Sequence, residues 1–256
     1  MKTWMKVLLI AAGCLAVLGL ALGAAGLAMG GSAASSPEPG TGDENSYQIS
    51  AQGITSLDID WVAGNVILEP WEGEEIQVEE RSRGQLTEKK RLTYQVDGDT
   101  LEIRFQKPGL RFGFQPYGKD LRVRIPQTLA DQLRELEIEN VSADFSLSGL
   151  GVQKLEMNTV SGSLKALDLE TDSLEFESVS GDLTAQLGNR PAVLELETVS
   201  GSAELKLPTG IDLSAELDSV SGDFRSELPC ISGSNAAAWK ISMESVSGDL
   251  TILGDN

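Results

Sequence analysis

The sequence contains no histidine, only two cysteines and few aromatic residues, and each shortage excludes a class of site. Without histidine the chain cannot build a Ser-His-Asp or Cys-His catalytic system, nor a metal site with imidazole ligands. Two cysteines cannot supply a four-cysteine metal site or a disulfide framework. Because aromatic residues make up only 5 % of the chain, its core must be built mainly from Leu, Ile and Val.

Basic residues are also scarce, with 20 Lys and Arg against 39 Asp and Glu, which gives a formal net charge of −19. A chain of this charge repels nucleic-acid phosphates, so we expect no nucleic-acid partner. Its apolar content of 41 % is nevertheless too high for a disordered chain. The 256 residues suffice for one large or elongated domain.

The longest apolar run lies at the N-terminus, from Val7 to Met29, and it contains no charged residue. As a helix this run would span about 34 Å, enough to cross a hydrocarbon core of about 30 Å. Lys2 and Lys6 precede it and predict that the N-terminus stays in the cytoplasm. We therefore expect residues 1–29 to be a signal anchor of a single-pass membrane protein, with the C-terminal domain extracytoplasmic.

Two alternatives remain for this segment, and both also place the body outside the cytoplasm. Cleavage near Ser32-Ala33-Ala34, where small residues are suitably spaced, would yield a secreted protein. Ala11 to Cys14 resembles a lipobox, although Ala11 stands where Leu is usual. Residues 30–46 are rich in Gly, Ser and Pro and are predicted to form a flexible linker.

Six related copies organise the second half of the chain. Their core valines are Val141, Val160, Val179, Val199, Val220 and Val246. The intervals are 19, 19, 20, 21 and 26 residues, and an insertion before the final copy lengthens the last one. Such a regular period is the mark of a repeat architecture.

Apolar and polar residues alternate with period two within each copy, as in β-strands. Each copy therefore predicts a strand, a tight turn whose glycine permits positive φ, and a second strand. One such unit cannot bury its own apolar face, but stacked units can. The predicted fold is all-β, a parallel β-solenoid of 19–21-residue repeats over residues 136–256. An antiparallel β-sandwich is the structural alternative.

Stacking would place equivalent residues in columns. The predicted inner columns are Leu136, Leu155, Leu174 and Leu194, and Ile138, Met157, Phe176, Leu196, Leu217 and Met243. The predicted polar ladder at the corners is Asn140, Thr159, Ser178, Thr198, Ser219 and Ser245. Residues 47–135 are predicted to form a β-rich N-terminal cap, with a degenerate copy at 56–70 and a type I′ hairpin turn at 96–99.

The repeated cores and the exported anchor resemble the bacterial "putative adhesin" family of the DUF4097 type, a domain of unknown function. The matching motifs are Val160–Ser163, Val179–Asp182, Val220–Asp223 and Val246–Asp249. Ala143 replaces the glycine in the first copy. The resemblance covers residues 56–256 and implies an envelope protein, often anchored by one membrane segment, without established catalytic residues.

The corner residues are the first candidates for chemistry, since paired carboxylates on a β-helix can cleave polysaccharides. We interpret them instead as structural turn residues, because a position that recurs at most corners usually caps backbone N–H groups. The predicted set is Ser161, Gly162, Ser180, Gly181, Asp182, Ser200, Gly201, Ser221, Gly222, Asp223, Ser247, Gly248 and Asp249.

The second candidate is an acidic ladder on the outer side of the repeats. One predicted column is Glu137, Glu156, Glu175, Glu195 and Glu216, and the other is Glu139, Glu177, Glu197, Asp218 and Glu244. Ca²⁺ would relieve the repulsion between such carboxylates. The calcium-binding solenoid motif is absent, however, so we expect a solvated face and no cofactor.

The third candidate is a basic and aromatic loop within the cap, which could hold a wall polymer or lipid headgroups by charge and stacking. Its predicted ligand-binding residues are Arg104, Lys107, Arg111, Phe112, Phe114, Tyr117 and Lys119. The alternative is that its aromatic residues plug the end of the solenoid. Cys230 is expected to be a buried thiol or a thiol for an intermolecular bridge.

Together these features predict a membrane-anchored, non-enzymatic, adhesin-like binding or structural module of the cell envelope. An accessory of an envelope-stress sensing system, binding wall polymer or an envelope protein, is one alternative. A polysaccharide-active β-helix enzyme is the other. Because the last copy ends without an evident cap, self-association through the terminal coil is also expected.

Overall fold

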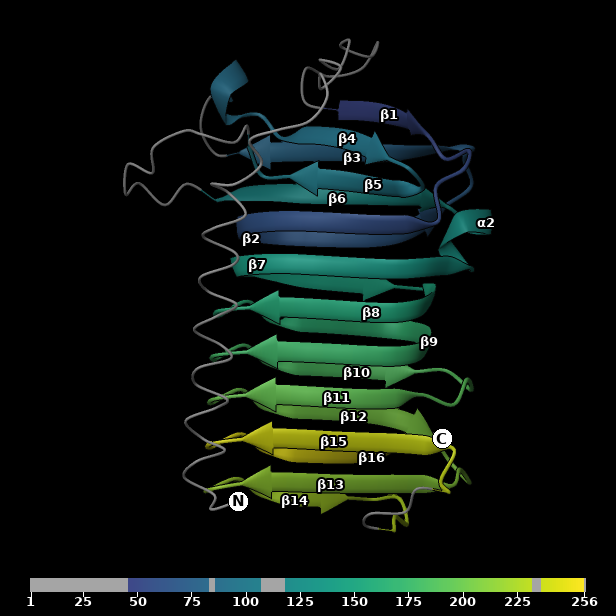
Figure 1. The fold of residues 1–256 in the computed structure, drawn as a ribbon, viewed down its shortest axis with the longest axis vertical. Helices are drawn as coiled ribbons and strands as arrows, with labels where there is room; N and C mark the ends of the chain where they lie inside the picture. The colour runs from purple at the N-terminus through teal and green to yellow at the C-terminus, as the bar shows by residue number, and fades with distance from the viewer. Residues whose placement is uncertain (1–45, 83–85, 107–117, 232–235, 256) are drawn as a thin grey trace.

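The computed structural model describes residues 46–82, 86–106, 118–231 and 236–255, which form an elongated stack of β-coils (Figure 1). The predicted anchor and most of the predicted linker lie outside these residues. Among the described residues, no helix has both the length and the apolar character needed to span a bilayer. The all-β class predicted from the alternation is confirmed.

Each coil has two arms that lie on opposite sides of the stack and meet at a corner. The first arms form sheet 1, whose spatial order is β5 (Thr100–Arg104), the first half of β2 (Ser56–Trp71), the first half of β7 (Leu133–Ser148), β8 (Gly151–Thr159), the second half of β9 (Leu164–Ser178), β11 (Val193–Thr198), β15 (Trp239–Ser245) and β13 (Leu213–Ser219).

The second arms form sheet 2. Its order is β6 (Lys119–Pro126), the second halves of β2 and β7, the first half of β9, β10 (Leu183–Leu187), β12 (Ala203–Pro208), β16 (Leu250–Asp255) and β14 (Phe224–Ser226). All of these neighbouring arms pair in parallel, as a solenoid requires.

Antiparallel strands cover the first coil. In sheet 2, β3 (Glu75–Ser82) pairs with β6, and β1 (Ser46–Ser50) pairs with the outer edge of β3. In sheet 1, β4 (Thr93–Asp97) pairs with the outer edge of β5. Tyr47 and Tyr94 close the gap between the two extensions, with ring centroids 5.4 Å apart in an edge-on contact. The helical segments are the single turns η1 (Glu88–Lys90) and α2 (Gln127–Ala130).

The degenerate copy predicted at 56–70 is a complete coil. Strand β2 lies in register with β7 along both arms, with Leu57 opposite Leu136 and Val66 opposite Phe145. Strands β5 and β6 form a further coil above it, so the coils extend into the region predicted as a cap. In that coil, Arg104 pairs with Asp60 and Leu121 pairs with Val66.

The hairpin between β4 and β5 is present, but its turn type differs from the prediction. Asp97 pairs with Thr100, so Gly98 and Asp99 are the two central residues of the turn. Gly98 has a φ of +62°, whereas the φ of Asp99 is not positive. A type I′ turn needs positive φ at both central positions, so the type I′ prediction is wrong.

The predicted columns are confirmed by the strand register. Leu136, Leu155, Leu174 and Leu194 are successive neighbours, and all are fully buried. The second inner column also forms, but its last members stand in the order Leu196, Met243, Leu217. Side chains of equivalent coils therefore stack as expected, although the order of the coils is not the order of the chain.

The last two coils are exchanged relative to the sequence. The final coil, β15 and β16, lies between the coil of β11 and β12 and the coil of β13 and β14 (Figure 1). The insertion that lengthens the last repeat interval joins β14 to β15 and lets the chain return into the stack. The end of the stack is therefore residues 213–226, and the prediction that the last copy forms it is wrong.

Candidate functional site

The corners depend on a close approach of one coil to the next. A Cβ added to Gly181 would lie 2.0 Å from the carbonyl oxygen of Gly162, and one on Gly201 would lie 1.9 Å from that of Gly181. Gly162, Gly222 and Gly248 meet the neighbouring coil in the same way, and none of these five described glycines has positive φ. Glycine is thus required by the spacing of the coils, and the left-handed backbone expected from the sequence is wrong.

The buried polar ladder closes each corner from inside. The Gly162 N–H donates to Thr159 Oγ1 at 2.9 Å, and the Gly201 N–H donates to Thr198 Oγ1 at 2.8 Å. The equivalent bond from the Gly248 N–H to Ser245 Oγ is 3.2 Å. These side chains satisfy backbone donors that would otherwise be buried without a partner.

The corner Asp and Ser residues form a second, exposed ladder from coil to coil. The Ser202 N–H donates to Asp182 Oδ1 at 2.8 Å, and the Asp182 N–H donates to Ser163 Oγ at 3.3 Å. The spatial order is Asp144, Ser163, Asp182, Ser202, Asp249 and Asp223. Carboxylates alternate with hydroxyls along this ladder, except that Asp249 and Asp223 are neighbours at its end. The alternation keeps most of the like charges two coils apart.

The serines of the Val-Ser-Gly cores also bond to the preceding coil. Ser161, Ser180, Ser200 and Ser221 each donate from Oγ to a valine carbonyl oxygen at 3.3–3.5 Å. The Ser247 N–H donates to the Val199 carbonyl oxygen at 3.1 Å. The corner residues with nucleophilic or acidic groups are therefore held by hydrogen bonds between neighbouring coils.

The outer surface of sheet 1 carries the acidic columns, which we call the acidic face. Its first column is Asp58, Glu137, Glu156, Glu175, Glu195, Ser242 and Glu216, and its second is Asp60, Glu139, Asn158, Glu177, Glu197, Glu244 and Asp218. The register brings all predicted ladder residues together. It adds Asp58 and Asp60, which the repeat alignment alone did not reveal, and it interrupts the columns at Ser242 and Asn158.

Crowding on the acidic face makes its carboxyl groups harder to ionise. Burial, followed by the charges of Asp60 and Glu137, raises the pKa of Glu139 to about 7. Burial and the charge of Glu197 raise the pKa of Glu177, and burial and Glu244 raise that of Glu197. Glu139 is therefore only partly ionised near neutral pH.

Arg104 lies at the top of the acidic face. Its guanidinium bonds both carboxylate oxygens of Asp58, at 2.6 and 2.7 Å, and lies 3.6 Å from Asp60 and 3.3 Å from Glu102. A bidentate pair of this kind fixes the orientation of the guanidinium. The structure thus places this predicted ligand-binding residue in an ion-pair cluster.

Lys119, the other described charged residue of the predicted loop, is completely buried. Its ammonium donates to Glu80 Oε2 at 2.8 Å, to the Lys90 carbonyl oxygen at 2.8 Å and to the Phe105 carbonyl oxygen. It also lies 4.3 Å from the ring centroid of Phe105. This side chain does not face a solvent-borne ligand, because its donors join the two ends of the loop to the cap.

The other predicted loop residues lie outside the described residues. These are Lys107, Arg111, Phe112, Phe114 and Tyr117. The strand register gives only the described residues on either side of the segment: Asp60 pairs with Arg104, and Val66 pairs with Leu121. Its ligand-binding role stays a prediction.

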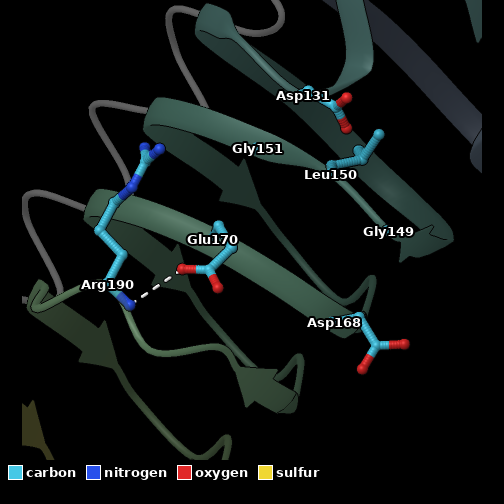
Figure 2. A pocket seen from close by; sticks show the side chains of 7 residues that line it. All are labelled: Asp131, Gly149, Leu150, Gly151, Asp168, Glu170 and Arg190. Atoms are coloured by element: carbon cyan, nitrogen blue, oxygen red, sulfur yellow. Dashed lines mark hydrogen bonds between the residues drawn. The ribbon is translucent and has the colours of Figure 1, made fainter. Parts of the chain in front are cut away.

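A hollow of about 240 Å³ lies at the opposite ends of the arms, where one coil passes to the next (Figure 2). Glu170 points across it and accepts the backbone N–H of Arg190 at 2.9 Å and that of Asn189 at 3.1 Å. The carboxylate of Asp168 points away from Glu170 (Figure 2). Glu170 therefore fastens the next connecting loop, and within the described part of the chain no three acidic or sulfur side chains converge as a metal site would require.

The Toastrack DUF4097 family model matches residues 54–255. The chain belongs to this family. The match begins just before β2 and ends with β16, so the Toastrack domain includes every coil, among them the one in the predicted cap region. The family recognised from the Val-Ser-Gly-Asp cores is thereby confirmed.

Several solved structures resemble the Toastrack domain weakly. A putative cell adhesion protein from Clostridium sporogenes is 14 % identical with a TM-score of 0.49, the similarity covering 82 % of this chain and 98 % of that one. A putative adhesin from Bacteroides fragilis is 13 % identical with a TM-score of 0.45, covering 81 % and 96 %. A putative lipid binding protein from Parabacteroides distasonis is 16 % identical with a TM-score of 0.33, covering 84 % and 98 %. No curated protein matches the chain.

Proposed function

We propose that this Toastrack domain is a non-enzymatic, adhesin-like binding module of the bacterial cell envelope. The observation that carries the proposal is how the corner residues are used. At each described repeat, a corner hydroxyl or carboxylate group bonds to a neighbouring coil. The repeats then offer flat, regular outer surfaces, which suit binding to a partner. Membership of a family without established catalytic residues supports the same function.

The proposal includes a tether at the membrane. The apolar run from Val7 to Met29 would hold the domain, and the linker at residues 30–46 would separate the coils from the bilayer. The first described strand, β1, lies at the capped end of the stack (Figure 1). In this arrangement the cap faces the bilayer side, and residues 213–226 point away from it.

Charge distinguishes the two surfaces that could bind. The acidic face repels anionic wall polymers and anionic lipid headgroups, since like charges on successive strands lie about 4.8 Å apart. An anionic partner would therefore have to bind through the basic and aromatic loop that contains Arg111, Phe112, Phe114 and Tyr117. Binding through this loop would weaken as salt rises.

The binding test uses the full chain in neutral phosphatidylcholine nanodiscs and purified anionic wall polymer. We expect retention of the polymer at low salt and its loss in the triple variant Phe112→Ser, Phe114→Ser, Tyr117→Ser. Val96→Ser is the matched control, because Val96 is an exposed apolar residue of the neighbouring hairpin. Release of cleaved glycan, or equal retention by the triple variant, would contradict the proposal.

The topology test uses intact cells that carry the full chain with an N-terminal tag. Protease added outside should remove the β-coils and leave the tag with the cells. Protection of the coils in intact cells, followed by digestion after lysis, would place them in the cytoplasm and overturn the tethered arrangement.

A further inference from the structure

The hydrophobic core is incompletely covered at the end of the stack that residues 213–226 form. Leu213 and Ala215 are buried there, but two other apolar side chains of this coil are exposed. Phe224 ends the inner column that begins with Leu121 and continues through Val66 and Phe145. It is 39 % exposed, whereas Phe145 is 1 % exposed. Val220, the corner valine of the same coil, is 57 % exposed. Phe224 and Val220 are exposed because no further coil of the described chain stacks on them. They occupy the same positions in the repeat as residues that are more buried in the other coils.

The backbone at this end is open as well. Strand β13 pairs with β15 and strand β14 pairs with β16, and within the described chain no strand pairs with their other edges. One hydrogen bond, from the Ile231 N–H to the Leu213 carbonyl oxygen at 3.0 Å, covers the start of β13. At the opposite end, antiparallel strands pair with the edges of β6 and β5, so described strands cover the strand edges at that end and not at this one.

We propose that this end, formed by β13, β14 and the corner at Val220, binds the same end of a second copy of the chain. The inter-coil interface within the molecule supports this occupant, because each coil already buries its apolar columns against a coil of the same repeat. A second copy supplies an end of the same outline, with two strand edges, two rows of apolar side chains and a corner. A single strand of an unrelated protein could pair with the edge of β13 or of β14. It could not contact both edges and the corner at the same time.

Charge selects one arrangement of the two copies. The outer side of β13 carries Glu216 and Asp218, whereas that of β14 carries the exposed Arg225, whose guanidinium lies 3.7 Å from the exposed Asp223 of the same coil. A two-fold axis parallel to the strands sets β13 of one copy beside β14 of the other, so these opposite charges approach. The same axis brings the two Val220 corners together. Continuing sheet 1 into sheet 1 would instead place acidic columns end to end.

The consequence for function rests on the proposed membrane tether. If the capped ends face their own membranes, an end-to-end pair joins two opposing membranes, so the contact would be homophilic adhesion. The contact itself does not need that tether, and it can be tested in detergent. Its failure and the failure of the proposed envelope function are therefore distinguishable.

The first experiment is disulfide trapping of the full chain in detergent micelles. The variant Val220→Cys, made together with Cys14→Ser and Cys230→Ser, should form a covalent dimer under mild oxidation. Val96→Cys in the same background is the matched control, since Val96 is 50 % exposed at the capped end. Trapping at position 220 alone supports the arrangement, whereas no trapping or equal trapping at both positions overturns it.

The second experiment follows clustering of phosphatidylcholine vesicles that carry the full chain, by light scattering. Clustering should fall about tenfold or more with Val220→Lys and with Arg225→Glu, because the contact then holds uncompensated charges. Leu167→Lys, on the outer side of sheet 2 away from this end, should cluster like the native chain. A control that loses clustering equally would overturn the end-to-end contact. Native vesicles that stay dispersed, although Val220→Cys is trapped in detergent, would overturn the homophilic adhesion and leave the contact in place.

Discussion

The Lys119 ammonium lies 2.8 Å from Glu80 Oε2, and both side chains are wholly inaccessible to solvent. Glu80 also accepts the Leu92 N–H at 3.0 Å, and the Trp61 indole N–H donates to the Lys119 carbonyl oxygen at 2.9 Å. The pair thus connects β3, β6, the first arm of β2 and the segment before β4. A charge pair used in this way holds the cap onto the first coils.

Removing one member of this pair should cost far more stability than removing an exposed ion pair. Lys119→Met leaves the Glu80 carboxylate buried without its partner and should lower the free energy of unfolding by about 3–5 kcal/mol. Lys206→Met is the control, because Lys206 bonds Asp255 at 2.6 Å on the surface, and it should cost about 1 kcal/mol or less. Urea unfolding followed by tryptophan fluorescence measures both, and equal losses would contradict a buried role.

The corner glycines should not tolerate a methyl group. Gly181→Ala forces the Gly162 carbonyl oxygen to move and should cost about 1–3 kcal/mol or more, because the clash involves backbone. Gly98→Ala is the matched control: its Cβ meets nothing within 4 Å, and only its positive φ should cost, about 1 kcal/mol. Thermal unfolding compares the two, and a smaller loss for Gly181→Ala would show that the coils can separate cheaply.

The acidic face should make the folded chain more stable as the pH falls toward 5. A carboxyl group with a raised pKa in the folded state binds more protons there than in the unfolded chain. The stability that Glu139 contributes is complete below its ordinary pKa of 4.5 and is lost as the pH rises through about 7. After solvent screening we expect the effect of this one group to be about 1 kcal/mol or less.

Glu139→Gln isolates this contribution. The variant should be more stable than the native chain at pH 8 and should show a smaller change between pH 5 and 8. Unfolding curves measured at constant ionic strength across this range give the two slopes. Identical slopes would mean that Glu139 titrates in the folded chain as it does in the unfolded one.

Salt should stabilise the coils by screening, without a specific cation. Raising the NaCl concentration to about 0.5 M shortens the Debye length to a few ångströms and weakens the repulsion between stacked carboxylates. At equal ionic strength, Ca²⁺ and Mg²⁺ should raise the unfolding temperature by similar amounts. A saturable effect confined to Ca²⁺ would instead establish a bound ion on the acidic face.

Local patterns in the sequence predict much of this fold because the interactions concerned repeat. An equivalent apolar residue at each period must find its own kind when coils stack, which is why the column through Leu155 and Leu174 was predictable. The same argument predicts the buried ladder through Thr159. For the acidic face, the spacing predicted which glutamates align, but not that Asp58 and Asp60 continue the columns.

Features set by non-local contacts were not predictable. Lys119 resembled the other basic residues of its loop until the fold brought Glu80, from another strand, against it. The role of Gly181 depends on the carbonyl oxygen of the coil above, which no local pattern reveals. The turn at Gly98 likewise took a conformation that its Asp-Gly sequence did not specify.

The sequence by itself determined the all-β class, the family and the contents of each column, because a periodic pattern has few ways to bury its apolar face. Only the tertiary structure decided the order of the coils. The connection after β14 allows the last coil to return between two others, and the pairing of β15 with both β11 and β13 is a long-range choice. That choice, made by packing and not by local preference, leaves Val220 and Phe224 at the open end of the molecule.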